Sequence, residues 1–164
     1  MKKLTLIRHA KAEDPTLHQK DFDRALSHKG LKQAARIAQQ LKEQRFTCDA
    51  IFTSTALRAL TTARTIGQNT LSAQQTLHET DDLYTFDSEQ LYRFIELIDD
   101  NIQHAVIVGH NPALSLLLSE LVREPVQNMS TCSVAELELA IDEWVDIHPG
   151  CAKLLNQLTP KSLQ

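Results

Sequence analysis

Cysteine is scarce in this sequence, and its few copies are scattered. The 164 residues include three cysteines, Cys48, Cys132 and Cys151. They are too few and too far apart for a disulfide framework, and the lack of a Cys-x-x-Cys pair argues against a zinc site built on thiolates. Free thiols persist in a reducing compartment, so we expect a cytoplasmic protein.

Excess basic charge and long apolar runs are also absent. The formal net charge of -4 argues against nucleic acid or an acidic membrane surface as a partner. The best apolar stretch, residues 113–118, is far shorter than a membrane span. At the N-terminus, only residues 4–7 separate the two lysines from Arg8, which is too short for the apolar core of a signal peptide.

The composition is that of an ordinary globular protein, with 42% hydrophobic and 23% charged residues. We find no repeat or long linker, and the length suits a single domain over residues 1–164. Apolar runs predict strands over 4–7, 50–53, 105–108, 134–139 and 144–147. Apolar residues at helical spacing predict helices that begin after Ser27, after Ser54, at Ser88 and at Pro112, the last with Asn111 as its N-cap.

The alternation of strands and helices predicts an α/β fold. We expect a three-layer α/β/α sandwich, in which helices cover both faces of a mostly parallel central sheet. Two interpretations of residues 149–164 stay open. They form either a docked helical turn around Leu154, Leu155 and Leu158 or a loosely docked tail.

Two of the predicted strands end directly before a histidine. Residues 4–7 lead into Arg8 and His9, and residues 105–108 lead through Gly109 into His110. In α/β sheets, ligands bind beyond the carboxyl ends of the strands. Two histidines delivered there from distant parts of the sequence therefore indicate one site.

Arginines accompany these histidines. Arg8 precedes His9, and Arg58 lies in the first turn of the helix that follows the strand 50–53. Arg58 and His110 both stand near predicted helix N-termini, where free backbone N–H groups and the helix dipole favour anions. An arginine fork binds phosphate oxygens in pairs, and a neutral imidazole is a competent nucleophile near pH 7. We interpret the set as a site for phosphoryl transfer through a phosphohistidine.

Four segments occur in an order that resembles a known family. They are Arg8-His9-Ala10-Lys11-Ala12, the segment 21–30 with Asp23-Arg24-Ala25-Leu26-Ser27 and Gly30, the segment 54–63 with Ser54, Arg58, Ala59, Thr62 and Ala63, and Val108-Gly109-His110-Asn111-Pro112. Together they resemble the motifs of the histidine phosphatase superfamily, the phosphoglycerate mutase-like enzymes. More narrowly, they resemble the short SixA-type phosphohistidine phosphatases. Each motif alone is weak, whereas four in the family's order are a strong signal.

The resemblance implies a phosphoglycerate mutase-like fold and a role for each motif residue. His9 would be the phosphorylated nucleophile, and Arg8 and Arg58 would bind the phosphoryl oxygens. His110 would hydrogen-bond the phosphoryl group and stabilise charge in the in-line transition state. Arg24 would be a further phosphate-binding arginine. Water would then hydrolyse the phosphohistidine, and such enzymes need neither a metal nor another cofactor.

Three features depart from the family's pattern. Leu60-Thr61 replaces the usual Gln-Thr neighbourhood, which we interpret as a difference in packing. Ala10 stands where the signature has glycine, so we expect this turn to keep an ordinary backbone conformation. Larger relatives also place an acid after the second helix, which protonates an alcohol leaving group. The candidates for this general acid are Glu79, Asp81 and Asp82, with Glu79 the best placed by analogy, and the alternative is that all three are solvated loop acids.

The poor match for a general acid favours a particular substrate. An alkoxide leaves badly without a proton donor, whereas the leaving nitrogen of a phosphohistidine can be protonated near neutral pH because imidazole titrates around 6.5. The stretch 59–109 also leaves little chain for a cap over the site. An open site suits a phosphorylated protein, such as a histidine phosphotransfer domain or a phosphotransferase-type carrier.

The sequence therefore predicts a metal-independent phosphatase that dephosphorylates phosphohistidine on a signalling or phosphotransfer protein. Three alternatives stay open: a phosphomonoesterase or mutase that acts on a small metabolite, a non-catalytic phosphate-binding module, and a metal-dependent phosphatase. A carboxylate of Glu79 that points into the pocket would favour the first. A His9 that never becomes phosphorylated would favour the second, and activity that a chelator abolishes would favour the third.

Overall fold

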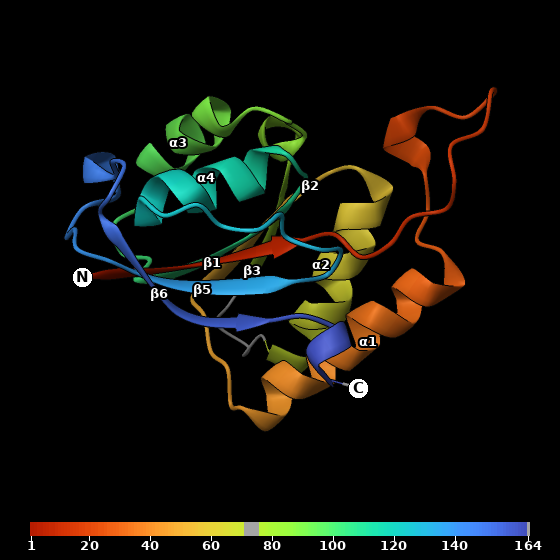
Figure 1. The fold of residues 1–164 in the computed structure, drawn as a ribbon, viewed down its shortest axis with the longest axis horizontal. Coiled ribbons are helices and arrows are strands. Elements are labelled where there is room, and N and C mark those ends of the chain that lie inside the picture. Colours follow the sequence, from red (N-terminus) through yellow and green to blue (C-terminus); the bar gives the residue numbers. More distant parts are fainter. Residues whose placement is uncertain (71–75, 164) are drawn as a thin grey trace.

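The computed structural model describes residues 1–70 and 76–163, which form one six-stranded sheet with helices on both faces (Figure 1). The main elements along the chain are β1 (Lys2–Arg8), α1 (His28–Glu43), β2 (Ala50–Ser54), α2 (Leu57–Thr70), β3 (Thr76–Thr80), α3 (Ser88–Glu96), β4 (His104–Gly109), α4 (Ala113–Val122), β5 (Val134–Leu139) and β6 (Ala152–Leu158). None of the described helices has the length and apolar content needed to cross a membrane.

The strands lie in the order β3-β2-β4-β1-β5-β6. Strands β3, β2, β4 and β1 run parallel to one another, whereas β5 is antiparallel to β1 and β6 is antiparallel to β5. The predicted α/β sandwich with a mostly parallel sheet is thus confirmed. The register sets Arg8 opposite Gly109, so β1 and β4 end side by side and deliver the residues that follow them to the same edge of the sheet.

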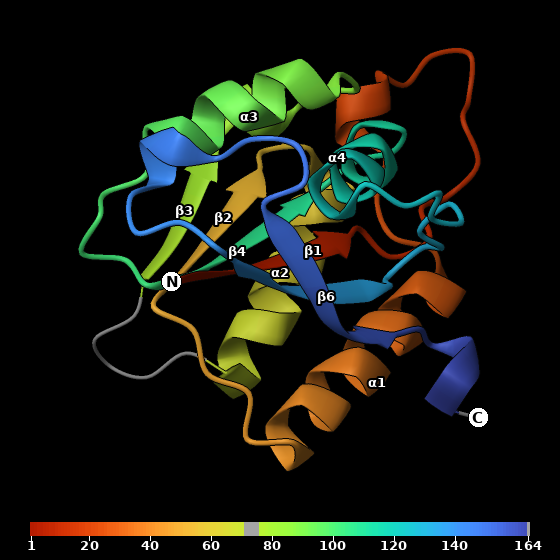
Figure 2. The ribbon, with the colours of Figure 1, turned by 60° about the vertical axis from the view of Figure 1, so that its left-hand side comes forward.

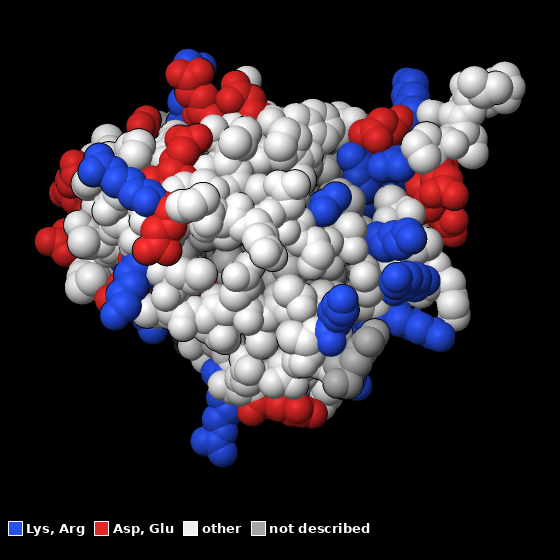
Figure 3. All heavy atoms as spheres, viewed as in Figure 1, with Lys and Arg blue, Asp and Glu red and all other residues white. Residues whose placement is uncertain are grey.

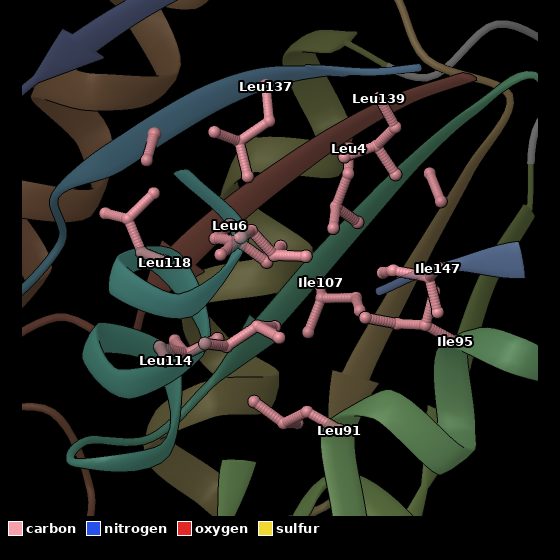
Figure 4. Packing of buried hydrophobic residues seen from close by; sticks show 14 of the residues in the cluster. Leu4, Leu6, Leu91, Ile95, Ile107, Leu114, Leu118, Leu137, Leu139 and Ile147 are labelled. Carbon is pink, nitrogen blue, oxygen red and sulfur yellow. The ribbon is translucent and has the colours of Figure 1, made fainter. Parts of the chain in front are cut away.

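Each face of the sheet buries its own apolar core. Helices α1 and α2 cover one face, and α3 and α4 cover the other (Figure 1, Figure 2). Leu114 of α4 and Leu91 of α3 pack in one cluster with Ile107 of β4 (Figure 4). Ile37 of α1 belongs to the opposite cluster, together with Val106. Because β4 is buried on both faces, its sequence is a continuous apolar run, as is typical of a central parallel strand.

The helices begin close to the polar residues that predict them. The Ser27 side chain accepts a hydrogen bond from the N–H of Gly30 and caps α1. Helix α4 begins at Ala113, one residue later than predicted, so that Pro112 is the N-cap. The Asn111 side chain still accepts a hydrogen bond from the N–H of Ser115, at 3.2 Å. Shifts of this size are usual at helix ends.

The prediction of a strand over residues 144–147 is wrong. Residues Trp144–Asp146 form a short 3-10 turn instead. Trp144 is fully buried, its backbone N–H donates to the Asp100 carboxylate at 2.8 Å, and its indole N–H donates to the carbonyl of Ile102 at 2.8 Å. These two hydrogen bonds to a distant loop, which no local pattern shows, decide the conformation.

Both edge strands were missing from the sequence-based prediction. Residues 76–80, expected as part of a polar loop that holds Glu79, form β3 beside β2. Residues 149–164, expected as a helical turn or a loose tail, contain β6, which pairs with β5 along its length. Neither segment shows a regular alternation of buried and exposed residues. Backbone hydrogen bonds to the neighbouring strand define them, and such pairing leaves no clear pattern in the sequence.

Candidate active site

The two histidines lie together beyond the carboxyl ends of β1 and β4. The ring centroids of His9 and His110 are 5.1 Å apart, and the residues are only 7% and 2% exposed. The backbone of His9 is fixed from two sides. Its N–H donates to the carbonyl of Gly109 at 3.1 Å, and its carbonyl accepts from the N–H of Cys132 at 3.0 Å. Strand pairing therefore sets the position of the histidine pair.

One ring nitrogen of His9 faces the backbone, and the other faces Arg58. Nδ1 lies 2.7 Å from the carbonyl oxygen of Ala10. Because a carbonyl oxygen can only accept, Nδ1 carries the proton in this contact. The neutral ring then has a free electron pair on Nε2, toward which Nε of Arg58 donates at 3.4 Å. This is the form that a nucleophilic histidine requires.

Burial keeps both histidines neutral. Together with the charges of Arg58, Arg8 and Arg24, it lowers the pKa of His9 to about 4, against the opposing effect of the hydrogen bond to Ala10. Burial likewise lowers the pKa of His110 to about 3, with contributions from His9 and Arg58. At neutral pH the positive charge of the site therefore resides on the arginines, which is where an anion would bind.

Arg58 is a buried cation whose guanidinium is held by Asp21. It is 2% exposed, its Nη1 donates to the backbone carbonyl of Asp21 at 2.7 Å, and its Nη2 donates to Oδ2 of Asp21 at 2.9 Å. The hydroxyl of Thr62 joins the first turn of α2 to the end of β1, because it accepts from the N–H of Ala10 at 3.0 Å and donates to the carbonyl of Arg58 at 2.8 Å. These contacts orient the Nε edge of Arg58 toward His9.

The Asp21 carboxylate also contacts two further side chains, those of Arg24 and Tyr84. Its Oδ1 lies 3.2 Å from Nε of Arg24, and its Oδ2 accepts from the hydroxyl of Tyr84 at 2.7 Å. Burial alone would raise the pKa of the Asp21 carboxyl, but the hydrogen bonds from Tyr84 and Arg58 and the charges of the two arginines hold it below its usual value. Asp21 is therefore an ionised group that links two of the predicted phosphate-binding arginines.

Arg8 enters the cluster from the last position of β1. Its Nη1 donates to the backbone carbonyl of Met129 at 2.9 Å, and burial lowers the pKa of its guanidinium. Its Nε is buried and makes no hydrogen bond within the described part of the chain. A half-buried cation whose buried N–H is free is a ready donor to an anion.

His110 is anchored through one nitrogen only. Its Nε2 lies 2.9 Å from Oγ of Ser54, which in turn accepts from the N–H of Ala56 at 3.2 Å. The Ser54 hydroxyl proton is thus free to be donated to Nε2, which leaves the proton of the neutral His110 ring on Nδ1. Nδ1 is buried and has no hydrogen-bond partner among residues 1–70 and 76–163. Buried donors without a partner are rare, and a bound oxyanion would satisfy this one.

The candidate general acid, Glu79, lies apart from this cluster. It is on β3, and its carboxylate is 3.6 Å from Nη2 of Arg64 in a partly exposed ion pair. Within the described residues it makes no hydrogen bond or ion pair with either histidine. Asp81 accepts a hydrogen bond from the hydroxyl of Thr55. The carboxylate that does enter the arginine cluster belongs to Asp21.

Several residues of the site did not emerge from the sequence as site residues. Asp21, Ser54 and Thr62 lie inside the motif segments, and their spacing from Arg24 and Arg58 is a signal that could have identified them. Tyr84 and Phe86 follow β3 with no motif around them. The expectation for Ala10 is confirmed, because it does not have a positive φ. No three His, Cys, Asp or Glu side chains in the described residues are grouped to hold a metal ion.

The class of protein follows from the family model that the sequence matches. The model of the histidine phosphatase superfamily (branch 1) matches residues 4–87. This range contains the end of β1 with His9, the Asp21 segment and the first turn of α2 with Arg58. The chain belongs to the histidine phosphatase superfamily and has the phosphatase fold of that family.

Similar proteins extend over the whole chain. An uncharacterized protein of Mycobacterium tuberculosis is 29% identical over 94% of this chain and 100% of its own length. A structure from Agrobacterium tumefaciens, described as a candidate phosphohistidine phosphatase SixA, has a TM-score of 0.82 and 26% identity, and the match covers 97% of this chain and 98% of that one. The protein histidine phosphatase SixA in complex with tungstate has a TM-score of 0.80 at 20% identity over 99% of each chain.

Enzymes that act on small molecules share the fold at a greater distance. A mycobacterial glucosyl-3-phosphoglycerate phosphatase has a TM-score of 0.69 and 17% identity, and the match covers 94% of this chain and 97% of that one. At this identity the similarity concerns the fold alone. The fold is thus shared by a protein histidine phosphatase and a metabolite phosphatase, and the substrate must be inferred from this chain's own site.

Proposed function

We propose that this protein is a phosphohistidine phosphatase that works through a phosphorylated His9. The observation that supports the proposal most directly is the state of His9, which is a buried neutral ring. Its Nδ1 proton is donated to the carbonyl of Ala10, and its unprotonated Nε2 lies beside Nε of Arg58. Arg8, Arg24 and Arg58 supply the positive charge around it, and Nδ1 of His110 supplies an unpaired donor. A SixA protein of the same fold has been solved in complex with tungstate, an oxyanion shaped like phosphate, which agrees with a protein that binds oxyanions.

The reaction has two displacements at phosphorus. In the first, Nε2 of His9 forms a bond to phosphorus, and the bond from phosphorus to the substrate nitrogen breaks. The substrate imidazole, protonated by solvent on its other nitrogen, leaves as a neutral ring. In the second, a water oxygen attacks phosphorus and the bond to Nε2 breaks. Inorganic phosphate departs with one proton of the water, and the other proton passes to solvent. Arg8, Arg58 and His110 stabilise the charge on the equatorial oxygens in both steps.

Retention of the Nδ1 proton explains how the intermediate can turn over. When Nε2 carries the phosphoryl group and Nδ1 keeps its proton, the His9 ring is positively charged. The carbonyl of Ala10, 2.7 Å away, stabilises that charge. A positively charged ring is a good leaving group, because it departs as a neutral imidazole. Neither displacement then needs a carboxylic acid from the enzyme, which fits the position of Glu79 away from the histidines.

The chain between Arg58 and His110 favours a protein as the substrate. The described residues between Arg58 and His110 form α2, β3 and α3, and both helices pack on the sheet faces, so this described part supplies no separate cap. A phosphohistidine on a histidine phosphotransfer domain or a phosphotransferase-type carrier could therefore reach His9. The cytoplasmic location expected from the free cysteines stays a prediction.

A rate comparison tests the proposal. Wild-type protein and His9→Ala are assayed with EDTA present on a phosphohistidine-bearing protein, on phosphoramidate and on a serine or sugar phosphomonoester. We expect the P–N substrates to be preferred, His9→Ala to be inactive, and wild-type protein quenched during turnover to carry an acid-labile, base-stable phosphoryl group. Near-normal activity of His9→Ala would exclude the covalent mechanism. Preference for the ester would favour the metabolite phosphatase, and inhibition by EDTA would favour a metal-dependent enzyme.

A further inference from the structure

Three aromatic side chains stand in a row beside His110. The ring centroids of Phe22 and Tyr84 are 5.3 Å apart, and those of Tyr84 and Phe86 are 5.7 Å apart. Tyr84 and Phe86 in turn lie 5.4 Å and 5.5 Å from the ring of His110. Every one of these distances is in the range of favourable aromatic pairs. We call Phe22, Tyr84 and Phe86 the aromatic wall.

Core packing does not account for the aromatic wall. None of its three residues belongs to either apolar core of the described structure. Phe86 is 48% exposed, and Phe22 and Tyr84 are only partly buried. A single exposed phenylalanine needs no explanation, but three aromatic rings, two of which contact His110, place apolar ring faces beside a cluster of arginines.

The direction of the reaction brings the leaving group toward this wall. In an in-line displacement, the leaving atom lies on the side of phosphorus opposite the attacking Nε2 of His9. His9 is 7% exposed and forms the floor of the site, so the leaving group lies on the outer side. Phe86 is the half-exposed residue in contact with His110, the histidine beside the phosphoryl group. A leaving group that extends past His110 therefore meets the face or edge of Phe86.

We propose that the aromatic wall binds the imidazole ring of the substrate's phosphohistidine and so makes the site selective for ring-bearing P–N donors. This inference rests on the function proposed above and adds a specificity determinant to it. A planar ring can stack on Phe86 or meet its edge, as His110 already does. The ring is protonated before it leaves, and a cationic ring is attracted both to aromatic faces and to the Asp21 carboxylate, which accepts from the Tyr84 hydroxyl at 2.7 Å.

Two small substrates separate recognition of the ring from recognition of the P–N bond. N-phosphorylimidazole carries the ring, and phosphoramidate carries the same kind of bond without it. We measure kcat/KM for both with wild-type protein, Phe86→Leu, Phe86→Tyr and, as the matched apolar control far from the site, Leu97→Ala, whose side chain is 86% exposed. The ratio of the two kcat/KM values is the readout, because a general loss of activity cancels in it.

We expect Phe86→Leu to lower the ratio of N-phosphorylimidazole to phosphoramidate by about 3- to 10-fold, the size of one aromatic pair. Phe86→Tyr, which keeps the ring, should retain the ratio of the wild-type protein, as should Leu97→Ala. A ratio that Phe86→Leu leaves unchanged would overturn the inference. A different result would contradict the proposed function. Either the wild-type protein would hydrolyse neither P–N compound, or His9→Ala would hydrolyse them as fast as the wild-type protein does.

Discussion

The carboxylate of Asp21 lies 2.9 Å from Nη2 of Arg58, while Nε on the other edge of the same guanidinium faces Nε2 of His9 at 3.4 Å. One side chain, which belongs to the polar segment before α1, thus fixes the orientation of the arginine that borders His9, the proposed nucleophile. Since Asp21 also contacts Arg24 and Tyr84, it joins two arginines of the proposed phosphate site to the aromatic wall.

This relationship predicts that Asp21→Ala reduces catalysis more than it weakens folding. Without the carboxylate, Arg58 and Arg24 lose a shared acceptor, and the guanidinium of Arg58 can rotate away from His9. Because a hydrogen bond to a charged group contributes about 1.5–3 kcal/mol, we expect kcat/KM to fall roughly 10- to 100-fold. Asp14→Asn, on the same segment but exposed, is the control and should behave as wild type. A lower KM in Asp21→Ala would mean instead that the carboxylate competes with the substrate for Arg58.

Arg58→Lys should be nearly as inactive as Arg58→Ala. Lysine keeps the positive charge but cannot donate to Asp21 through two nitrogens and to Nε2 of His9 through a third, as the fixed fork of arginine does. We expect both variants to lose about 100-fold or more in kcat/KM, with the loss of two charge-assisted hydrogen bonds as the reason. Steady-state kinetics on phosphoramidate provide the measurement, and circular dichroism checks the fold. If Arg58→Lys retained a tenth or more of the activity, charge rather than geometry would be the contribution of Arg58.

The depressed pKa of His9 predicts where its ring titrates. Because burial and the arginines lower this pKa to about 4, the ring should stay neutral, and therefore nucleophilic, as pH falls from 7 toward 5, and should become protonated near pH 4. Nuclear magnetic resonance of the histidine rings measures the midpoint directly and does not depend on an acid-labile substrate. His9→Ala identifies which ring resonances belong to His9. A His9 midpoint between 6 and 7 would contradict the buried, neutral nucleophile.

The same shifts predict that acid destabilises the protein. The folded-state pKa values of His9 and His110, about 4 and about 3, lie below the unfolded value of about 6.5. Between these limits the unfolded chain binds more protons, so the free energy of unfolding decreases as pH falls below 6.5. Thermal unfolding from pH 7.5 to pH 4.5, roughly the range over which these groups act, should show this decrease, and His110→Gln should make it less steep. An unchanged slope in His110→Gln would assign the acid sensitivity to other groups.

Glu79→Gln tests whether the acid on β3 takes part in the reaction. Its ion pair with Arg64 is partly exposed, and such pairs contribute about 0–1 kcal/mol to stability. We expect kcat/KM to change less than about 2-fold on phosphoramidate and on a phosphomonoester, since Glu79 contacts neither histidine within the described residues. A loss of 10-fold or more that is confined to the ester would identify Glu79 as a general acid for alcohol leaving groups.

Gly30→Ala should disturb the segment that carries Asp21. A Cβ on Gly30 would lie 1.9 Å from the carbonyl oxygen of Lys11, a backbone atom, so the first turn of α1 and the chain after His9 would have to separate. Overpacking of this kind costs about 1–3 kcal/mol of unfolding free energy, which chemical denaturation would detect. Lys29→Ala, at the neighbouring exposed position, should be neutral. Equal stability of the two variants would show that the segment can move away at little cost.

The sequence predicted the centre of the fold and of the site because both depend on local patterns. The apolar runs of β1 and β4 identify buried parallel strands, and the residue after each strand end is a histidine. The contacts of Asp21 could not be predicted in this way. Its partners Arg58 and Tyr84 are 37 and 63 residues away in sequence, and nothing near Tyr84 indicates that its hydroxyl meets a carboxylate.

The elements that the sequence did not predict have one physical property in common. Strands β3 and β6 lie at the two edges of the sheet, where one side of each strand has no neighbour and side chains face solvent irregularly. Trp144 belongs to a turn because its indole and backbone N–H groups find acceptors in the loop before β4. In each case the conformation depends on a partner distant in sequence rather than on the segment's own pattern.

The hydroxyl of Thr62 affects how accurately His9 and Arg58 are positioned relative to each other. It accepts a hydrogen bond from the N–H of Ala10, the residue after His9. It donates a hydrogen bond to the carbonyl of Arg58, the arginine that contacts His9. One oxygen atom is therefore the common reference point for two groups that come from different layers of the sandwich. A displacement of the first turn of α2 away from the end of β1 would have to stretch one of these two hydrogen bonds, so the spacing between His9 and Arg58 is tied to a single short linkage.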